Sequence, residues 1–471
     1  MQTLKDGQTL KDALLAASPR FSPPPTPARA VLIHGAVMLL WVALFARAFV
    51  ADNVFAWSAG IAYVSYDTAL LVFVFCLTLR LYRPPSPARP ARRVSIGVIV
   101  AAYNEGRALP VVLSALRAQV DAPDEVIIAD DGSTDDTGAV LAGEMMPGWR
   151  WLRLPHQGKA QALNDALMVA STDVVMTVDA DTLLDPDAVG AMRRAFAADP
   201  HLVAATGVME PICGPGLGAR ALQWFQTYEY VRNFLSRYAW GRMDSLLLIS
   251  GAFAGYRLAA VREVGGFDAD SLVEDYELIH RLRWVASRRG LRWRTAVLGD
   301  AFARTDAPDS LGAFLRQRRR WFGGFLQTQH WYRAMIGDPK LGALGVAMLP
   351  VKALDTMQPL YGLLSVALLF AYAVTGRLGL VGSIGLVVVG KILLDIGFQL
   401  WGILLYRRWT GGRGSVGFGA ALLASLAEPF CFQILRHLGA ALGWVTLLTG
   451  SRTWGVQARA GLARVTATVD L

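Results

Sequence analysis

The chain has 471 residues, of which 54% are hydrophobic and 18% are charged, and its formal net charge is +9. Soluble domains contain about 25% charged residues, so a large part of this chain is expected to avoid water. The length excludes a small disulfide scaffold, and the many apolar residues exclude a chain that is mainly disordered.

The N-terminal part alternates between basic and apolar segments. Residues 1–29 are basic and proline-rich without an early apolar run, so they are predicted to form a disordered tail and not a cleavable signal. The apolar runs 30–50 and 54–79 are long enough to cross about 30 Å of hydrocarbon, which predicts two transmembrane helices within 30–82. The linker at 80–93 then carries five Arg and four Pro without an acidic residue.

The last third of the chain is apolar again. Residues 360–375 and 378–405 are predicted spans, although the second contains Lys391 and Asp395 one helical turn apart. The run 416–450 is too long for one straight span, and Pro429 is expected to split it into an interfacial and a spanning piece or into two short spans. We therefore expect interfacial and transmembrane helices over 341–450 and a tail over 451–471, with the number of spans open.

The positive charge belongs to the flanks and not to the middle of the chain. Residues 94–340 contain 26 basic and 29 acidic residues, so the flanks hold the remaining 20 basic and 8 acidic residues. Basic residues just outside apolar segments are typical of cytoplasmic loops. The charge thus predicts a multi-pass protein of the inner or plasma membrane with a cytoplasmic domain over 94–335, and it gives no reason to expect nucleic acid as a partner.

Within 94–335, short apolar runs alternate with amphipathic segments. The runs at 95–102, 125–129, 151–154, 174–178 and 202–206 are predicted strands, and segments such as 108–119 and 160–170 have helical spacing. Strands that alternate with helices predict an α/β fold with a doubly wound parallel sheet.

Polar residues gather where three of these strands end, at 103–105, at 130–133 and at 179–181. Ligands of such sheets bind beyond the carboxyl ends of the strands. Acidic clusters that meet at one edge repel each other unless a cation lies between them, and Mg²⁺ uses one or two carboxylates together with phosphate oxygens. The alternative is that DDGSTDDT is only a turn and a helix cap.

Seven segments occur in an order that points to one family: VIVAAYNEG, VIIADDGSTDDT, HQGKAQALNDAL, TVDADT, SGAFAGYR, LVEDYEL and QRRRW. Together with the flanking apolar runs, they resemble the membrane-embedded family 2 glycosyltransferases, which include poly-N-acetylglucosamine, chitooligosaccharide, hyaluronan and cellulose synthases. The resemblance implies a nucleotide-sugar-binding domain of the glycosyltransferase A type. It covers residues 97–321, although Ala102 and Val273 replace a usual Pro and Thr.

The resemblance also assigns the residues of the donor site. The positions that match the family's nucleotide-sugar contacts are Tyr103, Glu105, Asp130, Asp131, Lys159 and Asp179. Asp179 and Asp181 match the D-x-D motif, which implies that they bind Mg²⁺ or Mn²⁺ at the diphosphate.

The resemblance further implies catalytic roles for Asp275, Gln317, Arg320 and Trp321. Asp275 is expected to be the general base, and Glu274 beside it could raise its proton affinity. Arg320 is suited to a diphosphate, and Trp321 offers a flat face to an acceptor sugar. Two alternatives stay open: Asp275 caps a helix, or QRRRW belongs to a basic helix on an anionic membrane surface.

The implied activity is an inverting transfer from a UDP-sugar, such as UDP-N-acetylglucosamine or UDP-glucose, to a growing polysaccharide that passes across the membrane. The expected partners are the UDP-sugar, a glycan or lipid acceptor and membrane lipids, and an accessory subunit for export or regulation is allowed. One alternative is the transfer of a single sugar to a membrane lipid. Another is a transporter with a degenerate glycosyltransferase-like domain, in which Asp67 or the Lys391 and Asp395 pair would be the functional site.

Overall fold

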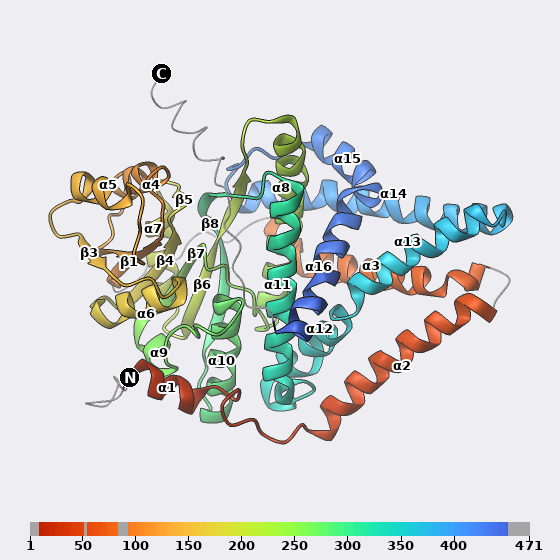
Figure 1. Cartoon of the computed structure of the whole chain (residues 1–471), viewed down its shortest axis with the longest axis horizontal. Helices are drawn as coiled ribbons and strands as arrows, with labels where there is room; N and C mark the ends of the chain where they lie inside the picture. The colour runs from red at the N-terminus through yellow and green to blue at the C-terminus, as the bar shows by residue number, and fades with distance from the viewer. Residues whose placement is uncertain (1–8, 51–53, 83–92, 451–471) are drawn as a thin grey trace.

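The computed structural model of the protein describes residues 9–50, 54–82 and 93–450 (Figure 1). The predicted C-terminal tail, most of the predicted linker and the first residues of the predicted N-terminal tail lie outside the described residues. Figure 1 shows a sheet flanked by short helices on one side of the molecule and long helices extending from the other side.

The described strands form one eight-stranded sheet in the order β3-β2-β1-β4-β7-β6-β8-β5. The strands are, in the same order, Arg150–Arg153, Glu125–Asp130, Ile96–Ala102, Val174–Asp179, Phe253–Arg257, Leu202–Ile212, Arg294–Asp306 and Thr182–Leu184. The predicted parallel arrangement is confirmed for the part formed by β3, β2, β1 and β4. In the other part β6 and β8 are also parallel to each other, and the prediction is wrong only for β7, which runs antiparallel to both β4 and β6, and for β5, which runs antiparallel to β8.

Burial explains which strands the sequence revealed. Strand β1 is almost entirely buried, as is usual for a parallel strand covered on both faces, and it therefore appears in the sequence as an uninterrupted apolar run. Strand β8 alternates between buried and more exposed positions, so its apolar residues are spread out. The helices near the sheet are α4 (Leu109–Arg117), α5 (Thr137–Glu144), α6 (Lys159–Val169), α7 (Ala188–Ala198), α9 (Leu258–Glu263) and α10 (Glu274–Arg289).

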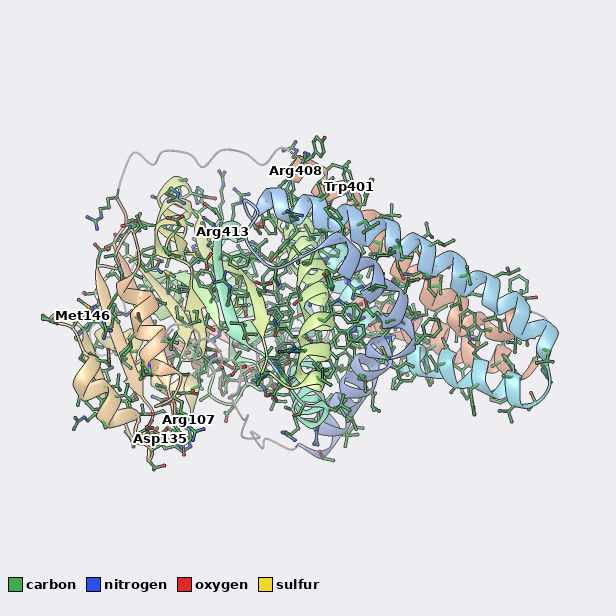
Figure 2. All side chains as sticks on the ribbon, turned by 90° about the horizontal axis from the view of Figure 1, so that it is seen from above. Arg107, Asp135, Met146, Trp401, Arg408 and Arg413 are labelled. Atoms are coloured by element: carbon green, nitrogen blue, oxygen red, sulfur yellow. The ribbon has the colours of Figure 1, made fainter. Side chains whose placement is uncertain are left out.

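Two long helices connect the sheet to the apolar flanks. Helix α8 (Leu217–Arg242) contacts β6 and β8 and also the apolar helices α3 (Ser58–Thr78) and α14 (Leu378–Trp409). Helix α11 (Leu311–Trp331) packs along α16 (Phe432–Thr449). Figure 2 shows α8 standing between the sheet and the long helices.

Among the described residues, three helices are long and apolar enough to cross a membrane. They are α2 (Ala28–Val50), the segment Val54–Tyr82, which comprises η1 (Val54–Trp57), α3 and η2 (Leu79–Tyr82), and α14. Two bent pairs raise the number to five if each pair forms one span. These helices and the composition indicate a membrane protein.

The bent pairs lie in the C-terminal third. Segment Leu344–Asp355, which comprises η5 (Leu344–Met348) and α12 (Leu349–Asp355), meets α13 (Gln358–Val374) at 42°. Helix α15 (Phe418–Ala427) continues into η6 (Glu428–Phe430), and the two meet α16 at 53°. Pro429 lies in η6, two residues before the break at Cys431, so the run is bent next to the proline at which a split was predicted. The short turns η3 (Arg333–Met335) and η4 (Pro339–Leu341) follow α11.

The predicted disordered tail is wrong for the described residues up to 29. Helix α1 (Leu10–Ala17) begins with a capping box between Thr9 and Asp12 and packs against α9. Arg20 Nη1 then lies 3.2 Å from Asp268 Oδ2. Helix α1 packs closely against the backbone of Gly265. A Cβ on Gly265 would lie 2.1 Å from the Leu14 nitrogen, so this contact requires a glycine.

Candidate active site

A cavity of about 2310 Å³ extends from the ends of the sheet strands into the membrane-length helices. Its lining includes Arg107 and Asp135 on the sheet side and Trp401 on α14 (Figure 2). The sequence-predicted residues that line it are Tyr103, Glu105, Asp131, Lys159, Asp179, Asp181, Asp275, Gln317, Arg320 and Trp321. Segments far apart in the sequence therefore contribute to one cavity.

The Asp131 carboxylate is held by the loop before α6. It is 3% exposed and accepts hydrogen bonds from the backbone N–H groups of Gln157 and Gly158 at 2.8 and 2.9 Å. His156 Nδ1 lies 2.9 Å from Asp131 Oδ2, and the His156 ring stacks on Tyr103 with centroids 4.1 Å apart. Sequence reasoning missed His156, although it stands two residues before the glycine of the Gly158-Lys159 pair. The stacked rings beside a fixed carboxylate offer a flat, polar surface to a planar ring.

Asp130 differs from its neighbour. Its Oδ1 accepts the N–H of Ser133 at 2.9 Å, and Asp130 is not among the residues that line the cavity. Asn104 supports the same turn, because its Oδ1 accepts the N–H of Thr134 at 2.8 Å. The predicted turn therefore accounts for Asp130, whereas the strand end presents Asp131 to the cavity. The assignment of Asp130 to nucleotide contacts is the one that this geometry does not support.

Glu105 begins the turn into α4. It is 6% exposed and lines the cavity, and its backbone N–H donates to Thr137 Oγ1 at 2.7 Å. The end of β1 is thus tied to the start of α5, which fixes the position of this carboxylate.

Lys159 joins two acidic segments. Its Nζ lies 2.5 Å from Asp179 Oδ1 and 3.6 Å from Glu274 Oε1. Burial alone would lower the pKa of Lys159, but the carboxylates of Asp179 and Glu274 outweigh burial and raise it. The amine is therefore a fixed positive charge at the centre of the site.

A third carboxyl group near Lys159 is that of Asp181. Burial, followed by repulsion from Asp179 and Asp306, raises the pKa of Asp181 well above its ordinary value. Among the described residues, no group of three or more His, Cys, Asp or Glu side chains is arranged to hold a metal ion. Carboxylate oxygens nevertheless suit Mg²⁺ or Mn²⁺, and a site of two carboxylates fits an ion that takes its other ligands from phosphates and water.

Asp275 lies in the first turn of α10. Its Oδ2 accepts the N–H of Gly251 at 2.6 Å, and its Oδ1 accepts the N–H of Tyr276 at 2.8 Å. A Cβ on Gly251 would lie 3.0 Å from that Oδ2, so a glycine leaves room for the contact. Burial and then the neighbouring Glu274 raise the pKa of Asp275. The N-cap of α10 is Val273, so Asp275 is not the capping residue, although its bond to the Tyr276 N–H lies in the first turn of the helix. Its position in the cavity agrees with a general base.

Among the QRRRW residues of α11, Arg320 contacts the loop that precedes Asp275. Arg320 Nη1 donates to the carbonyl of Leu272 at 3.3 Å, three residues before Asp275. Within the described part of the chain, the buried Oε1 of Gln317 finds no hydrogen-bond donor. Trp321 is partly buried, and the Arg318 guanidinium carbon lies 4.6 Å from the centroid of its ring.

The other arginines of this segment test the membrane-surface alternative. Arg318 is 9% exposed, and its Nη2 donates to Glu229 Oε2 on α8 at 2.6 Å. Arg319 Nε donates to Thr446 Oγ1 on α16 at 2.6 Å. These two guanidinium groups are bound to neighbouring helices, so the alternative of a basic helix lying on lipid is not supported for them.

Part of the chain is similar to known proteins. Residues 97–265 match the model of the family described as glycosyl transferase family 2. A poly-beta-1,6-N-acetyl-D-glucosamine synthase of Staphylococcus aureus (strain COL) is 33% identical over 238 residues, which cover 49% of this chain and 54% of that protein. The enzyme of the same name from Staphylococcus epidermidis is 29% identical over 240 residues with the same coverage. The chain spans about half the length of these curated relatives.

A solved structure shares the fold over more of the chain. The mannosyltransferase PcManGT from Pyrobaculum calidifontis, solved in complex with GDP-Man and Mn²⁺, superposes with a TM-score of 0.56 at 21% sequence identity. The match covers 80% of this chain and 99% of the mannosyltransferase.

Proposed function

This chain belongs to the family 2 glycosyl transferases through residues 97–265, and on that premise we propose that it transfers a sugar from a UDP-sugar to a growing polysaccharide. The proposed donor is UDP-N-acetylglucosamine, because the relatives that match half of the chain are named as poly-N-acetylglucosamine synthases. UDP-glucose is the next candidate.

One observation carries the proposal: Asp131, Asp179 and Asp275 line the same cavity although they come from three separate segments of the chain. In the proposed reaction, Asp131 and the stacked Tyr103 and His156 rings hold the uracil base. Lys159 provides positive charge at the diphosphate. These contacts orient the donor sugar toward Asp275.

The proposed reaction is one displacement with inversion at the sugar's anomeric carbon. The Asp275 carboxylate accepts the proton of an acceptor hydroxyl, whose oxygen forms the new bond to that carbon. The bond between the carbon and the diphosphate oxygen breaks, and UDP leaves with the electron pair. Asp179 and Asp181 would hold Mg²⁺ or Mn²⁺, which neutralises charge on the departing diphosphate. Gln317, Arg320 and Trp321 are proposed to bind the diphosphate and the acceptor sugar.

The cavity supports the second part of the proposal, which is that the polymer crosses the membrane through this chain. Beyond the candidate catalytic residues its lining continues along α3, α14 and α16, with polar side chains such as Gln399 and Gln433. The hydroxyl groups of a polysaccharide need hydrogen-bond partners inside the membrane, which polar side chains and water in the cavity would supply. In this account the nucleotide site faces the cytoplasm, where the basic flanking segments also lie.

The alternative product is a single sugar on a lipid acceptor. The test incubates the purified protein and Mn²⁺ with labelled UDP-N-acetylglucosamine, UDP-glucose or GDP-mannose and then sizes the product. A polymer made from a UDP-sugar supports the proposal. A single glycolipid supports the alternative, and no nucleotide release with any donor supports a transporter with a degenerate domain.

A further inference from the structure

Arg237 is a partly buried arginine in the wall of the cavity, and two of its donor nitrogens are buried and unused. It lies on α8, and its Nε and Nη1 are buried without a hydrogen-bond acceptor among the described residues. The contact recorded for its guanidinium group is with Phe234, whose ring centroid lies 4.6 Å from the guanidinium carbon. A guanidinium group in this position carries donors that the protein itself leaves open.

Other buried arginines of the chain do have acceptors. Arg281 is fully buried, and its Nη1 and Nη2 donate to the carbonyls of Val264 and Gly266 at 2.7 and 2.8 Å. Arg281 Nη2 also lies 2.7 Å from Glu277 Oε2. The fold therefore supplies partners for a buried guanidinium elsewhere, and their absence around Arg237 within the described residues calls for an explanation.

An arginine without acceptors makes the protein less stable, because a buried charge loses its hydration and gains nothing in return. In agreement, burial lowers the pKa of Arg237 to about 10, which the charges of Tyr230 and Asp275 only partly offset. Sequences retain such unfavourable arrangements mainly at functional sites, where a ligand completes them.

The position of Arg237 indicates which ligand this is. Arg237 interacts electrostatically with the carboxylate of Asp275, the proposed base, and not with Asp179 or Asp181 at the proposed diphosphate site. One turn further along α8, Trp240 packs on Phe73 of α3 with ring centroids 4.4 Å apart. Arg237 therefore lies where the proposed base and the membrane-length helices meet, on the side from which an acceptor chain would reach Asp275.

We propose that Arg237 binds the acceptor glycan, by donating hydrogen bonds to hydroxyl or amide oxygens of the sugar whose hydroxyl faces Asp275. The inference rests on the proposed function, because it requires that a glycan is the acceptor. It adds a specificity-determining residue on α8 to the residues that the sequence motifs contribute.

The test compares Arg237→Met and Arg237→Lys with a control, Arg242→Met, which removes an exposed arginine from the end of the same helix. Each purified full-length variant is given UDP-N-acetylglucosamine and Mn²⁺, with and without a short β-1,6-linked N-acetylglucosamine oligosaccharide. Transfer to the oligosaccharide, UDP released without it, the KM for the donor and the melting temperature are measured.

For Arg237→Met we expect a loss of transfer of roughly 10- to 100-fold, because hydrogen bonds from a charged group to the ligand are lost. UDP release without acceptor and the KM for the donor should stay unchanged, and the melting temperature should stay the same or rise. Arg237→Lys should recover part of the transfer, and Arg242→Met should match the unmodified protein.

Three results would overturn the inference: unchanged transfer by Arg237→Met, a parallel loss of donor binding, or a lower melting temperature. The last would mean that Arg237 has partners in the protein without ligand. If the unmodified protein neither releases UDP nor transfers sugar, the proposed function fails, and that result is distinct from a failure at Arg237.

Discussion

Arg318 Nη2 lies 2.6 Å from Glu229 Oε2, and this buried ion pair joins α11 to α8 in the wall of the candidate active-site cavity. The other oxygen of the same carboxylate, Glu229 Oε1, lies 3.6 Å from Arg436 Nη1 on α16. Three helices are thus linked through one glutamate. Arg318 stands two residues before Arg320 in QRRRW. The ion pair with Glu229 indicates a structural role for Arg318, whereas a role in ligand binding is proposed for Arg320.

Arg318→Met should therefore destabilise the protein by about 3–5 kcal/mol, because it leaves the Glu229 carboxylate buried with a single distant partner. Glu229→Gln combined with Arg318→Met should recover much of that loss, since no buried charge is then left behind. Melting temperatures of the single and double variants in detergent test this. A stable Arg318→Met variant that no longer binds UDP would contradict the structural role.

Asp131 and Asp130 are adjacent but should respond differently to alanine. Asp131→Ala removes the carboxylate that lines the cavity, and we expect UDP to bind at least about tenfold more weakly. Asp130→Ala removes the acceptor of the Ser133 N–H, so it should lower stability by about 1 kcal/mol and leave the affinity for UDP nearly unchanged. Calorimetric titration with UDP and thermal melting separate the two effects. Equal losses of UDP affinity would show that both carboxylates face the nucleotide.

The pH dependence of transfer should report Asp275. Burial and then Glu274 raise the pKa of this carboxyl group, and a general base works only when it is deprotonated. Activity should therefore rise with pH through an acid limb above the ordinary aspartate range. In Glu274→Gln the repulsion is gone, so the acid limb of kcat should move to lower pH. An acid limb that stays in place or moves upward would argue against Asp275 as the titrating base.

His280 should make the domain sensitive to acid. Burial lowers its pKa from 6.5 to about 4, and its Nδ1 lies 2.9 Å from the Tyr276 carbonyl. Because the folded state disfavours the proton, the stabilisation is present above pH 6.5 and is lost as the pH falls toward about 4. The loss is of the order of 3 kcal/mol. Replacing His280 with Gln should flatten the fall in melting temperature between pH 7 and pH 5, and an unchanged slope would contradict this account.

The sequence predicted the parallel strands and the acidic residues at their ends because these strands are buried on both faces. Strand β1 and the Asp131 and Asp179 positions were thus within reach, whereas Asp275, in the first turn of α10, was indicated only by the family resemblance. The α/β fold is confirmed, and residues 97–265 match the model of the predicted family. The antiparallel β7 was not predicted, because its pairing depends on the path of the 26-residue helix α8 before it. Pro429 was recognised because a proline inside an apolar run interrupts a helix.

Contacts between distant segments explain the remaining differences. His156 gains its importance from the Tyr103 ring and the Asp131 carboxylate, neither of which is near it in the sequence. The pattern DDGSTDDT does not reveal that Asp131 faces the cavity while Asp130 holds a turn. In the same way, the sequence of residues 9–29 predicts a disordered tail, because the ion pair between Arg20 and Asp268 joins residues that are far apart in the sequence.

Incorporation of labelled sugar by the Asp275→Asn variant tests the account most directly. The purified variant and the unmodified protein are incubated with labelled UDP-N-acetylglucosamine and Mn²⁺, and polymer, free UDP and UDP binding are measured. We predict that the unmodified protein makes polymer, and that the variant binds UDP normally but makes polymer about 10²- to 10⁴-fold more slowly. Equal polymer synthesis by both proteins would contradict the account.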